Sequence, residues 1–258
     1  MSTEPFAWAV LGMLGLTIGS FLNVCIYRLP LGRSIVSPGS SCPSCGYALR
    51  WGDNIPVASY AWLGGRCRSC RAPISIRYPV VELITMAVFV LHYAVLGPDP
   101  LLVPRLIFAC AMVVLFAIDL EHHLLPNVIT LPGILVGFLF SLLLLPGPVS
   151  SLAGILVGGG SLWLLGEAYY RYAGQEGMGG GDVKMLAMIG AFLGWQLTLV
   201  TLVLSSIAGA VIGLVIIGVK RGDLKYALPY GTFLSLAGLV ASLYGDRIVA
   251  WYVGFYGG

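Results

Sequence analysis

Two aspartates in the chain could act together on one substrate, and the first of them lies in a distinctive stretch. Asp182 belongs to the sequence GMGGGDVK, residues 177–184, which combines four glycines with one carboxylate and one ammonium group. The apolar residues that follow, Val183 to Trp195, predict a helix with Asp182 at its N-cap. Glycines tolerate positive φ and let another backbone approach closely, although a capped glycine-rich turn is the simpler alternative. The candidates for a substrate loop are Gly179, Gly180, Gly181 and Lys184.

The composition is that of a membrane protein. Hydrophobic residues make up 58% of the 258 residues, charged residues only 10%, and the mean hydropathy is +0.93. Soluble globular chains carry about a quarter charged residues. The first apolar run, residues 6–25, is long enough to span a bilayer and follows Glu4 without any Lys or Arg, so we expect no cleavable signal peptide. An ionisable residue among such segments is a functional candidate.

The apolar segments predict an all-α polytopic membrane protein with about eight transmembrane helices. Most connections are short, which predicts a compact antiparallel bundle. We expect three parts: a first transmembrane helix at 1–27, a cytoplasmic loop domain at 28–78, and a seven-helix membrane core at 79–258. The eight segments cover residues 6–27, 79–96, 101–118, 128–145, 149–168, 183–195, 197–219 and 229–252.

Lys and Arg residues predict the orientation of these segments. Only Arg105 and Arg247 fall on the side opposite the long loop, against twelve basic residues on the side of the loop. Because cytoplasmic loops are enriched in Lys and Arg, we expect the long loop in the cytoplasm and both termini outside. The twelve residues are Arg28, Arg33, Arg50, Arg66, Arg68, Arg71, Arg77, Arg171, Lys184, Lys220, Arg221 and Lys225.

Many of the 35 glycines recur four residues apart within the predicted helices. Such pairs let helix backbones approach each other in a bilayer, where lipid offers no hydrophobic drive for helices to associate. We therefore expect them to mark helix contacts and not chemistry. The pairs are Gly15/Gly19, Gly133/Gly137, Gly154/Gly158, Gly190/Gly194 and Gly209/Gly213.

Asp119 is the partner that this topology offers to Asp182, because both are expected near the cytoplasmic side. Arg105 marks the outer end of the third segment, 14 residues before Asp119, and the sixth segment turns at Trp195, 13 residues after Asp182. At about 1.5 Å per residue, both carboxylates lie about 20 Å inward from the outer side. In a hydrocarbon core of about 30 Å they would be recessed by about 10 Å. Irregular backbone at that depth requires protein or a wet cavity around it.

Two carboxylates at one depth suit the hydrolysis of a peptide bond. Close carboxylates do not both ionise cheaply, so one of them keeps a proton. The ionised group can take a proton from water while the protonated group hydrogen-bonds the carbonyl under attack. Asp119 and Asp182 are therefore the predicted catalytic residues. The alternative is two independent aspartates at helix ends, one capping and one solvated, and the spacing alone leaves both possibilities open.

Four cysteines in the long loop have the spacing of a metal site. The pairs Cys42/Cys45 and Cys67/Cys70 are separated by 21 residues. Four thiolates suit a tetrahedral structural zinc, and Gly46 favours the tight turn after the first pair. Two disulfides or a redox dithiol are the alternatives, but cytoplasmic thiols stay reduced, which favours zinc. A bound ion would stabilise a loop that has little core of its own.

Motifs along the whole chain resemble those of the type IV prepilin peptidases, a family of GxGD-type membrane aspartic proteases. The stretch around Asp182 is similar to the second-aspartate motif of that family, and Asp119 followed by Leu125-Pro126-Asn127 and Thr130 is similar to the first. Many members have Asp where this chain has Asn127. The other similar stretches are GSFLNVCIYRLP at 19–30, DNIPVASY at 53–60 and ISIRYPVVEL at 74–83.

The resemblance implies an aspartic endopeptidase of the bacterial cytoplasmic membrane, with its active site facing the cytoplasm. Its substrates would be prepilin or pseudopilin precursors of type IV pili or type II secretion, cut after a glycine that precedes an apolar helix. It also implies methylation of the new N-terminus with S-adenosylmethionine as methyl donor, and no nucleic-acid partner. The sequence contains no glycine-rich nucleotide-binding motif in a βαβ setting, so it predicts no cofactor-binding residues.

Two other classes of function also fit part of the sequence. Paired intramembrane aspartates serve proton relays in ion-coupled transporters. Such transporters usually contain an internal repeat, and neither the cysteine loop nor the glycine-rich stretch has a counterpart elsewhere in the chain. The chain could also be a zinc-dependent scaffold of a secretion machine, in which the aspartates would be dispensable.

Overall fold

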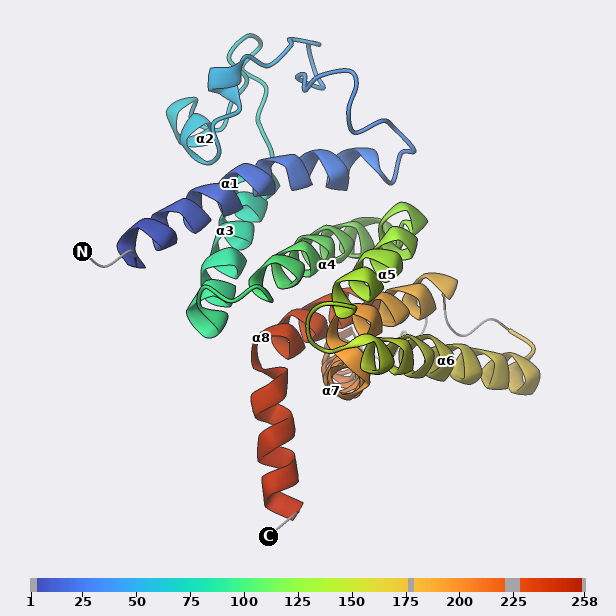
Figure 1. Cartoon of the computed structure of the whole chain (residues 1–258). Helices are drawn as coiled ribbons and strands as arrows, with labels where there is room; N and C mark the ends of the chain where they lie inside the picture. The colour runs from blue at the N-terminus through green and yellow to red at the C-terminus, as the bar shows by residue number, and fades with distance from the viewer. Residues whose placement is uncertain (1–3, 176–178, 221–227, 257–258) are drawn as a thin grey trace. The chain divides into compact units, whose positions relative to one another are not determined.

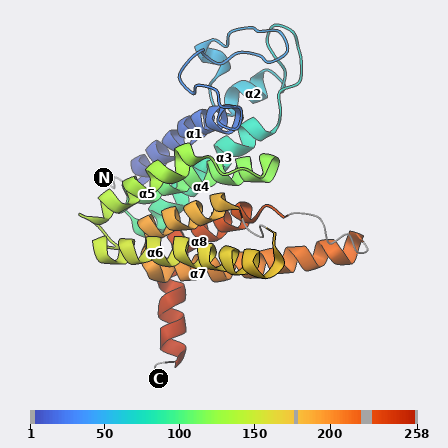
Figure 2. The same ribbon diagram turned by 90° about the vertical axis from the view of Figure 1, so that its right-hand side faces the viewer.

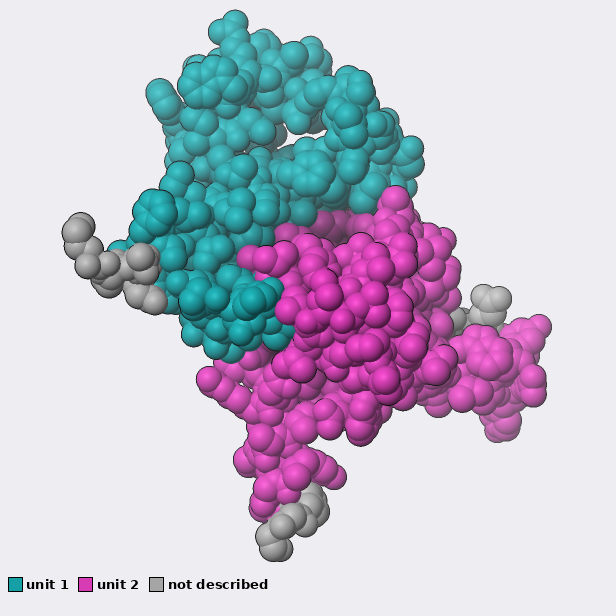
Figure 3. Space-filling view, in the orientation of Figure 1, with its two compact units in different colours: residues 1–102 teal, residues 103–258 magenta. Residues whose placement is uncertain are grey.

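The computed structural model describes residues 4–175, 179–220 and 228–256, and these residues are helical with no β-strand (Figure 1). Four residues named above lie outside the described residues: Gly177, Met178, Arg221 and Lys225. The chain forms two compact units, Met1–Leu102 and Val103–Gly258, which Figure 3 colours separately. The predicted all-α class is confirmed.

Each unit is built around long helices. The first contains α1 (Glu4–Arg28), the short turns η1 (Trp51–Asp53) and α2 (Ala58–Trp62), and α3 (Arg77–Leu96). The second contains α4 (Leu102–His122), α5 (Asn127–Ser141), α6 (Pro148–Ala173), α7 (Gly180–Lys220) and α8 (Tyr230–Tyr256). The long polar stretch of the sequence is the connection between α1 and α3.

Six of the described helices are long and apolar enough to cross a membrane, which confirms a multi-pass membrane protein. The exception among the long helices is α5, with 15 residues. The predicted segments 183–195 and 197–219 run together as α7, with a break at Gly194, where φ is 77° and ψ is 172°. The predicted turn at Trp195 therefore begins one residue earlier, at a glycine that adopts a positive φ without steric cost.

In the first unit, α1 and α3 approach closely along the predicted glycine pair. A Cβ on Gly15 would lie 2.7 Å from the Met86 Cα, and a Cβ on Gly19 would lie 2.7 Å from the Glu82 Cα. Asn23 adds a polar link, because its side-chain amide donates a hydrogen bond of 3.0 Å to the carbonyl of Tyr78. The small residues thus serve helix packing, as predicted.

In the second unit, α6 lies alongside α7 (Figure 2) and contacts it through glycine. A Cβ on Gly154 would overlap the carbonyl of Gly190. A Cβ on Gly158 would lie 2.5 Å from the Leu186 carbonyl oxygen and 3.1 Å from the Thr198 side chain. Because Leu186 precedes the break in α7 and Thr198 follows it, α6 packs against both limbs of α7.

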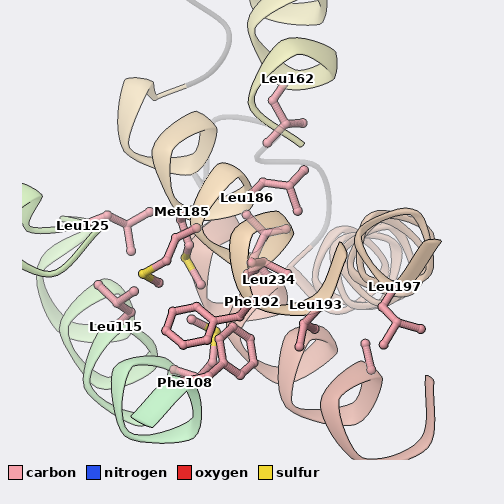
Figure 4. Packing of buried hydrophobic residues seen from close by; sticks show 14 residues of the cluster. Phe108, Leu115, Leu125, Leu162, Met185, Leu186, Phe192, Leu193, Leu197 and Leu234 are labelled. Carbon is pink, nitrogen blue, oxygen red and sulfur yellow. The ribbon is translucent and has the colours of Figure 1, made fainter. Parts of the chain in front are cut away.

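The helix α4 packs differently, through large side chains. Figure 4 shows Phe108 and Leu115 of α4 meeting Met185 and Phe192 of α7 in one buried cluster. The rings of Phe108 and Phe192 have centroids 5.4 Å apart. These contacts, together with Leu234 of α8, fix the three helices whose ends form the candidate active site.

Arg105, the expected outer anchor of α4, lies inside the helix packing of the second unit. It is only 5% exposed, and its guanidinium donates a hydrogen bond of 3.3 Å to the backbone carbonyl of Ser242 in α8. Asp246 lies near enough to interact with it electrostatically. Arg105 therefore links α4 to α8 at the end opposite Asp119.

We expect Gly154→Ala to lower the free energy of unfolding by about 1–3 kcal/mol, because the added methyl group would overpack the contact with α7. Gly160→Ala, on the same helix, is the matched control, since a Cβ there would meet no atom within 4 Å. Thermal unfolding of the detergent-solubilised protein measures both. Equal stability of the two variants would contradict the packing described here.

Candidate active site and metal site

Asp119 lies near the C-terminal end of α4 and is 5% exposed. Its Oδ2 accepts a hydrogen bond of 2.7 Å from the backbone N–H of Thr232 and one of 3.1 Å from the Thr232 hydroxyl. Thr232 is the third residue of α8, where the backbone N–H groups have no partner within the helix. Asp119 thus caps the N-terminus of a helix that begins 111 residues later in the chain.

The prediction that Asp182 is the N-cap of its helix is wrong, because Asp182 lies within the first turn of α7. The helix begins at Gly180, and the Asp182 N–H donates a hydrogen bond of 3.1 Å to the carbonyl of Gly179. Gly180 and Gly181 take helical conformations, so the positive φ that glycine allows is not used in this part of the loop. The helix therefore begins at Gly180, three residues before the predicted start at Val183.

The two carboxylates are brought together at three helix ends. Asp119 and Asp182 lie close enough to interact electrostatically. Leu125, which follows α4, lies between the other two helices: a Cβ on Gly181 would be 3.0 Å from its Cβ, and a Cβ on Gly231 would be 2.9 Å from its Cδ1. The ends of α4, α7 and α8 therefore converge, as a dyad requires.

The remaining residues of the predicted substrate loop divide into two kinds. Gly179 and Gly180 are exposed, and a Cβ on Gly180 would meet nothing within 4 Å, so the backbone there is open to approach. Lys184 instead donates a hydrogen bond of 2.9 Å from its Nζ to the side-chain oxygen of Asn127. It joins the first turns of α7 and α5, a role that the sequence did not suggest.

Sequence reasoning missed the residues of α8 that contact the dyad. It placed a membrane segment from residue 229 onward but assigned no role to Gly231 or Thr232. The available signal was the order Pro229-Tyr230-Gly231-Thr232, in which proline precedes a helix start and glycine permits close approach. Their partner, Asp119, lies more than a hundred residues away, so no local pattern reveals the contact.

The four loop cysteines converge in the first unit. Their sulfur atoms all lie within 4.8 Å of one another, and all four are free thiols. The Sγ atoms of Cys42 and Cys70 are 3.8 Å apart. Sulfur atoms around one tetrahedral ion at about 2.3 Å would be separated by about 3.8 Å. The cluster therefore has the size and the ligand type for a single metal ion, and not the contact distance of a disulfide.

The two CxxC pairs have the same local backbone structure. Cys42 donates its N–H to Tyr47, five residues later, and Cys67 does the same to Ala72, both at 2.9 Å. The turn closes at a residue of positive φ in each pair, 72° at Gly46 and 62° at Arg71. The predicted role of Gly46 is confirmed, and the second turn places an arginine in the conformation that favours glycine.

Backbone groups of these turns also act on the thiols. The N–H groups of Cys45 and Ser44 lower the pKa of Cys42 to about 6, which favours the thiolate form that binds metal. The N–H of Ala72 favours the thiolate of Cys70 in the same way. Hydrogen bonding to Cys45, together with burial and the other thiols, nevertheless raises the pKa of Cys70 to about 11. The thiol cluster therefore retains protons that a metal ion would displace.

Asp53 connects the two cysteine turns. Its side chain accepts a hydrogen bond of 2.6 Å from Arg68, within the second CxxC pair, and one of 3.2 Å from the hydroxyl of Tyr47, which follows the first pair. A third bond, of 3.1 Å, comes from the backbone N–H of Arg50. The bond with Arg68 holds the pKa of Asp53 below its usual value. Asp53 is thus a buried brace between the two halves of the loop.

We expect Asp53→Asn to release bound metal to a chelator about tenfold faster than the wild-type chain, because residues that orient metal ligands tune affinity at this scale. Transfer of metal to a chromogenic chelator measures the rate. Asp99→Asn, an exposed aspartate in the connection to α4, is the control and should release metal at the wild-type rate. An unchanged rate in Asp53→Asn would contradict the bracing role.

Two family models match the chain. The first is described as the bacterial peptidase A24 N-terminal domain and matches residues 13–96. The second is described as the type IV leader peptidase family and matches residues 106–214, which include Asp119 and Asp182. No solved structure matches the chain.

Several curated relatives carry the name prepilin leader peptidase/N-methyltransferase. The protein of Aeromonas hydrophila is 38% identical, over 93% of this chain and 92% of its own length. That of Pseudomonas aeruginosa is 35% identical, over 100% of this chain and 97% of its own length. That of Myxococcus xanthus is 41% identical over 83% of this chain and 64% of its own length. The resemblance seen in the motifs is confirmed, and the chain belongs to the type IV leader peptidase family.

Proposed function

We propose that this chain is a membrane aspartic endopeptidase that removes the leader peptide from type IV prepilin-like or pseudopilin precursors. The observation that carries the proposal is the convergence of Asp119 and Asp182 at three helix ends within the part of the chain that matches the peptidase model. The names of the relatives supply the class of substrate. The proximity of two aspartates from separate helices favours this function over that of a scaffold, in which both aspartates would be dispensable.

The chemistry is general acid–base hydrolysis without a covalent intermediate. One carboxylate removes a proton from water, and the resulting hydroxyl forms a bond to the carbonyl carbon of the peptide. The other carboxyl group donates its proton to the carbonyl oxygen. Collapse of the tetrahedral intermediate breaks the C–N bond, and the leaving amine takes the proton that the first carboxylate had received. One hydroxyl of the intermediate returns its proton to the second carboxylate as the C=O bond forms again, which restores the dyad. The exposed backbone of Gly179 and Gly180 offers hydrogen-bonding groups to an extended substrate.

The chain would act in the bacterial inner membrane, with both termini outside and the dyad facing the cytoplasm. The distribution of Lys and Arg supports this orientation. Asp119 and Asp182 would then lie below the cytoplasmic surface, where the apolar helix of a precursor could enter from the bilayer and present its leader. Basic residues in that leader would stay in the cytoplasm under the same rule.

The cysteine cluster would hold a structural zinc ion. Four thiolates are the ligands that structural zinc prefers, and four protein ligands leave no open position for catalysis. Its ligands would be Cys42, Cys45, Cys67 and Cys70, with Asp53 bracing their two turns. Zinc would hold together a loop whose only regular elements are η1 and α2.

Methylation of the new N-terminus, with S-adenosylmethionine as methyl donor, is the second proposed activity, and the names of the relatives support it. In the first unit, a groove of about 380 Å³ beside α1 offers the hydroxyls of Thr17 and Ser20, the amide of Asn54 and the guanidinium of Arg28. Its described lining includes no carboxylate to pair with a positively charged sulfonium. We therefore assign no step of methyl transfer to it.

We expect Asp119→Asn and Asp182→Asn each to lower the rate of prepilin cleavage by about 100- to 10,000-fold, because each removes a group that must gain or lose a proton. Conversion of a purified prepilin to the shorter mature form, followed on a gel, measures the rate. Asp99→Asn is the matched control and should cleave at the wild-type rate. Asp223, the other aspartate suited to this comparison, lies outside the described residues.

The outcome separates the three functions considered above. Cleavage that survives in either dyad variant would exclude the aspartic mechanism. Proton-coupled uptake that depends on both aspartates, without any cleavage, would favour a transporter. Normal function of both variants in pilus or secretion assembly would favour a scaffold.

We expect about one zinc ion per chain in protein purified without chelator, measured by elemental analysis. The double substitution of Cys42 and Cys45 by Ser should lose the ion and make the loop between α1 and α3 more sensitive to proteases. Metal-free wild-type protein with a fully protease-resistant loop would contradict the zinc site.

A further inference from the structure

The first turn of α8 contacts the candidate dyad in two ways that no motif had suggested. Thr232 directs both its backbone N–H and its hydroxyl to the same oxygen of Asp119, at 2.7 and 3.1 Å. Thr232 is itself only 6% exposed, so water competes little for either donor. Within the described residues, no hydrogen bond reaches the other oxygen, Oδ1.

Gly231, the residue before Thr232, makes this approach possible. A Cβ at this position would lie 2.9 Å from Asp119 Oδ2 and 2.9 Å from Leu125 Cδ1. A methyl group there would have to displace the Asp119 carboxylate, which is the free end of a side chain, or the tip of Leu125. Helix backbone would not need to move, so such a change would disturb the position of the carboxylate more than the stability of the fold.

Asp182 differs from Asp119 in its surroundings. In the described part of the chain, no side chain or backbone donor forms a hydrogen bond with its carboxylate. Asp119 is held by two donors at a helix N-terminus, an arrangement that matches a negatively charged acceptor. The two carboxylates of the dyad therefore differ in their surroundings: among the described residues, hydrogen bonds fix Asp119 in place but not Asp182.

We propose that Gly231 and Thr232 are positioning residues of the peptidase reaction: they hold Oδ2 of Asp119, so that Oδ1 is the oxygen that takes the proton from the attacking water. This inference rests on the proposed function. The O–H bond of water breaks, its proton goes to Oδ1, and its oxygen bonds to the carbonyl carbon of the substrate. The proton of Asp182 goes to the carbonyl oxygen. Neither Gly231 nor Thr232 exchanges a proton in this step.

The test compares kcat and KM for cleavage of a purified prepilin by the full-length chain in detergent. Thr232→Val removes the hydroxyl but keeps the backbone N–H, and we expect kcat to fall about tenfold, the effect of one lost hydrogen bond, with little change in KM. Thr232→Ser restores the hydroxyl and should recover most of the rate. Gly231→Ala should lower kcat by about a hundredfold, because a misplaced catalytic group costs about that much.

Two controls on α8 separate positioning from general damage. Ser235→Ala removes a hydroxyl that, among the described residues, bonds only the carbonyl of Gly231 one turn away. Gly254→Ala adds a methyl group that meets no described atom within 4 Å. Both should keep the wild-type kcat. All variants should retain the wild-type melting temperature within a few degrees, which shows that losses in kcat do not come from unfolding.

The outcomes are distinct. Wild-type kcat in both Thr232→Val and Gly231→Ala, beside an inactive Asp119→Asn, would overturn the positioning role and leave the proposed function intact. Full cleavage by Asp119→Asn would overturn the proposed function itself. If Gly231→Ala fails to fold, the two variants of Thr232 decide. A loss of kcat in Thr232→Val that is equally present in Thr232→Ser would overturn the inference. Recovery of kcat in Thr232→Ser would support it.

Discussion

A carboxylate buried among apolar helices must be hydrogen-bonded, and this requirement organises the second unit of the protein. An unpaired charge in such surroundings costs several kcal/mol. Asp119 meets the requirement with the two donors of Thr232, in the first turn of a helix, where backbone N–H groups have no acceptor within the helix. The Thr232 N–H also makes a longer hydrogen bond, of 3.2 Å, to the carbonyl of Pro229. The start of α8 is therefore fixed at the end of α4. A group suited to hydrolysis is thus also a group on which the arrangement of two helices depends.

The other half of the site is positioned by steric contact. α6 lies against both limbs of α7, on either side of the break at Gly194, through Gly154 and Gly158. Large side chains of α4, such as Phe108, then fill the space on the far side of that limb. Close contact on one face and interdigitated packing on the other leave α7 few alternative positions, so Asp182 at its start is held by the packing of the whole helix.

Residues that act locally or periodically were predictable, and residues that act across the chain were not. Apolar run lengths gave the helices, and four-residue glycine spacing gave the contacts at Gly15, Gly19, Gly154 and Gly158, because both patterns reflect one helix at a time. The cysteine spacing predicted a cluster for the same reason. The partners of Asp119 and the brace at Asp53 join segments that only the folded chain brings together. The helix start at Gly180 was missed because boundary residues obey tertiary packing more than local propensity.

The two cysteine turns share one backbone shape but not one sequence, and this difference makes the second turn the more strained of the two. Gly46 occupies the left-handed conformation freely, whereas Arg71 does so at a cost of about 1 kcal/mol. Without a ligand to hold it, the second turn is the one with conformational energy to release, so it should relax first. A metal ion held by all four cysteines would require Arg71 to keep this conformation, whereas the turn at Gly46 keeps its own without that cost.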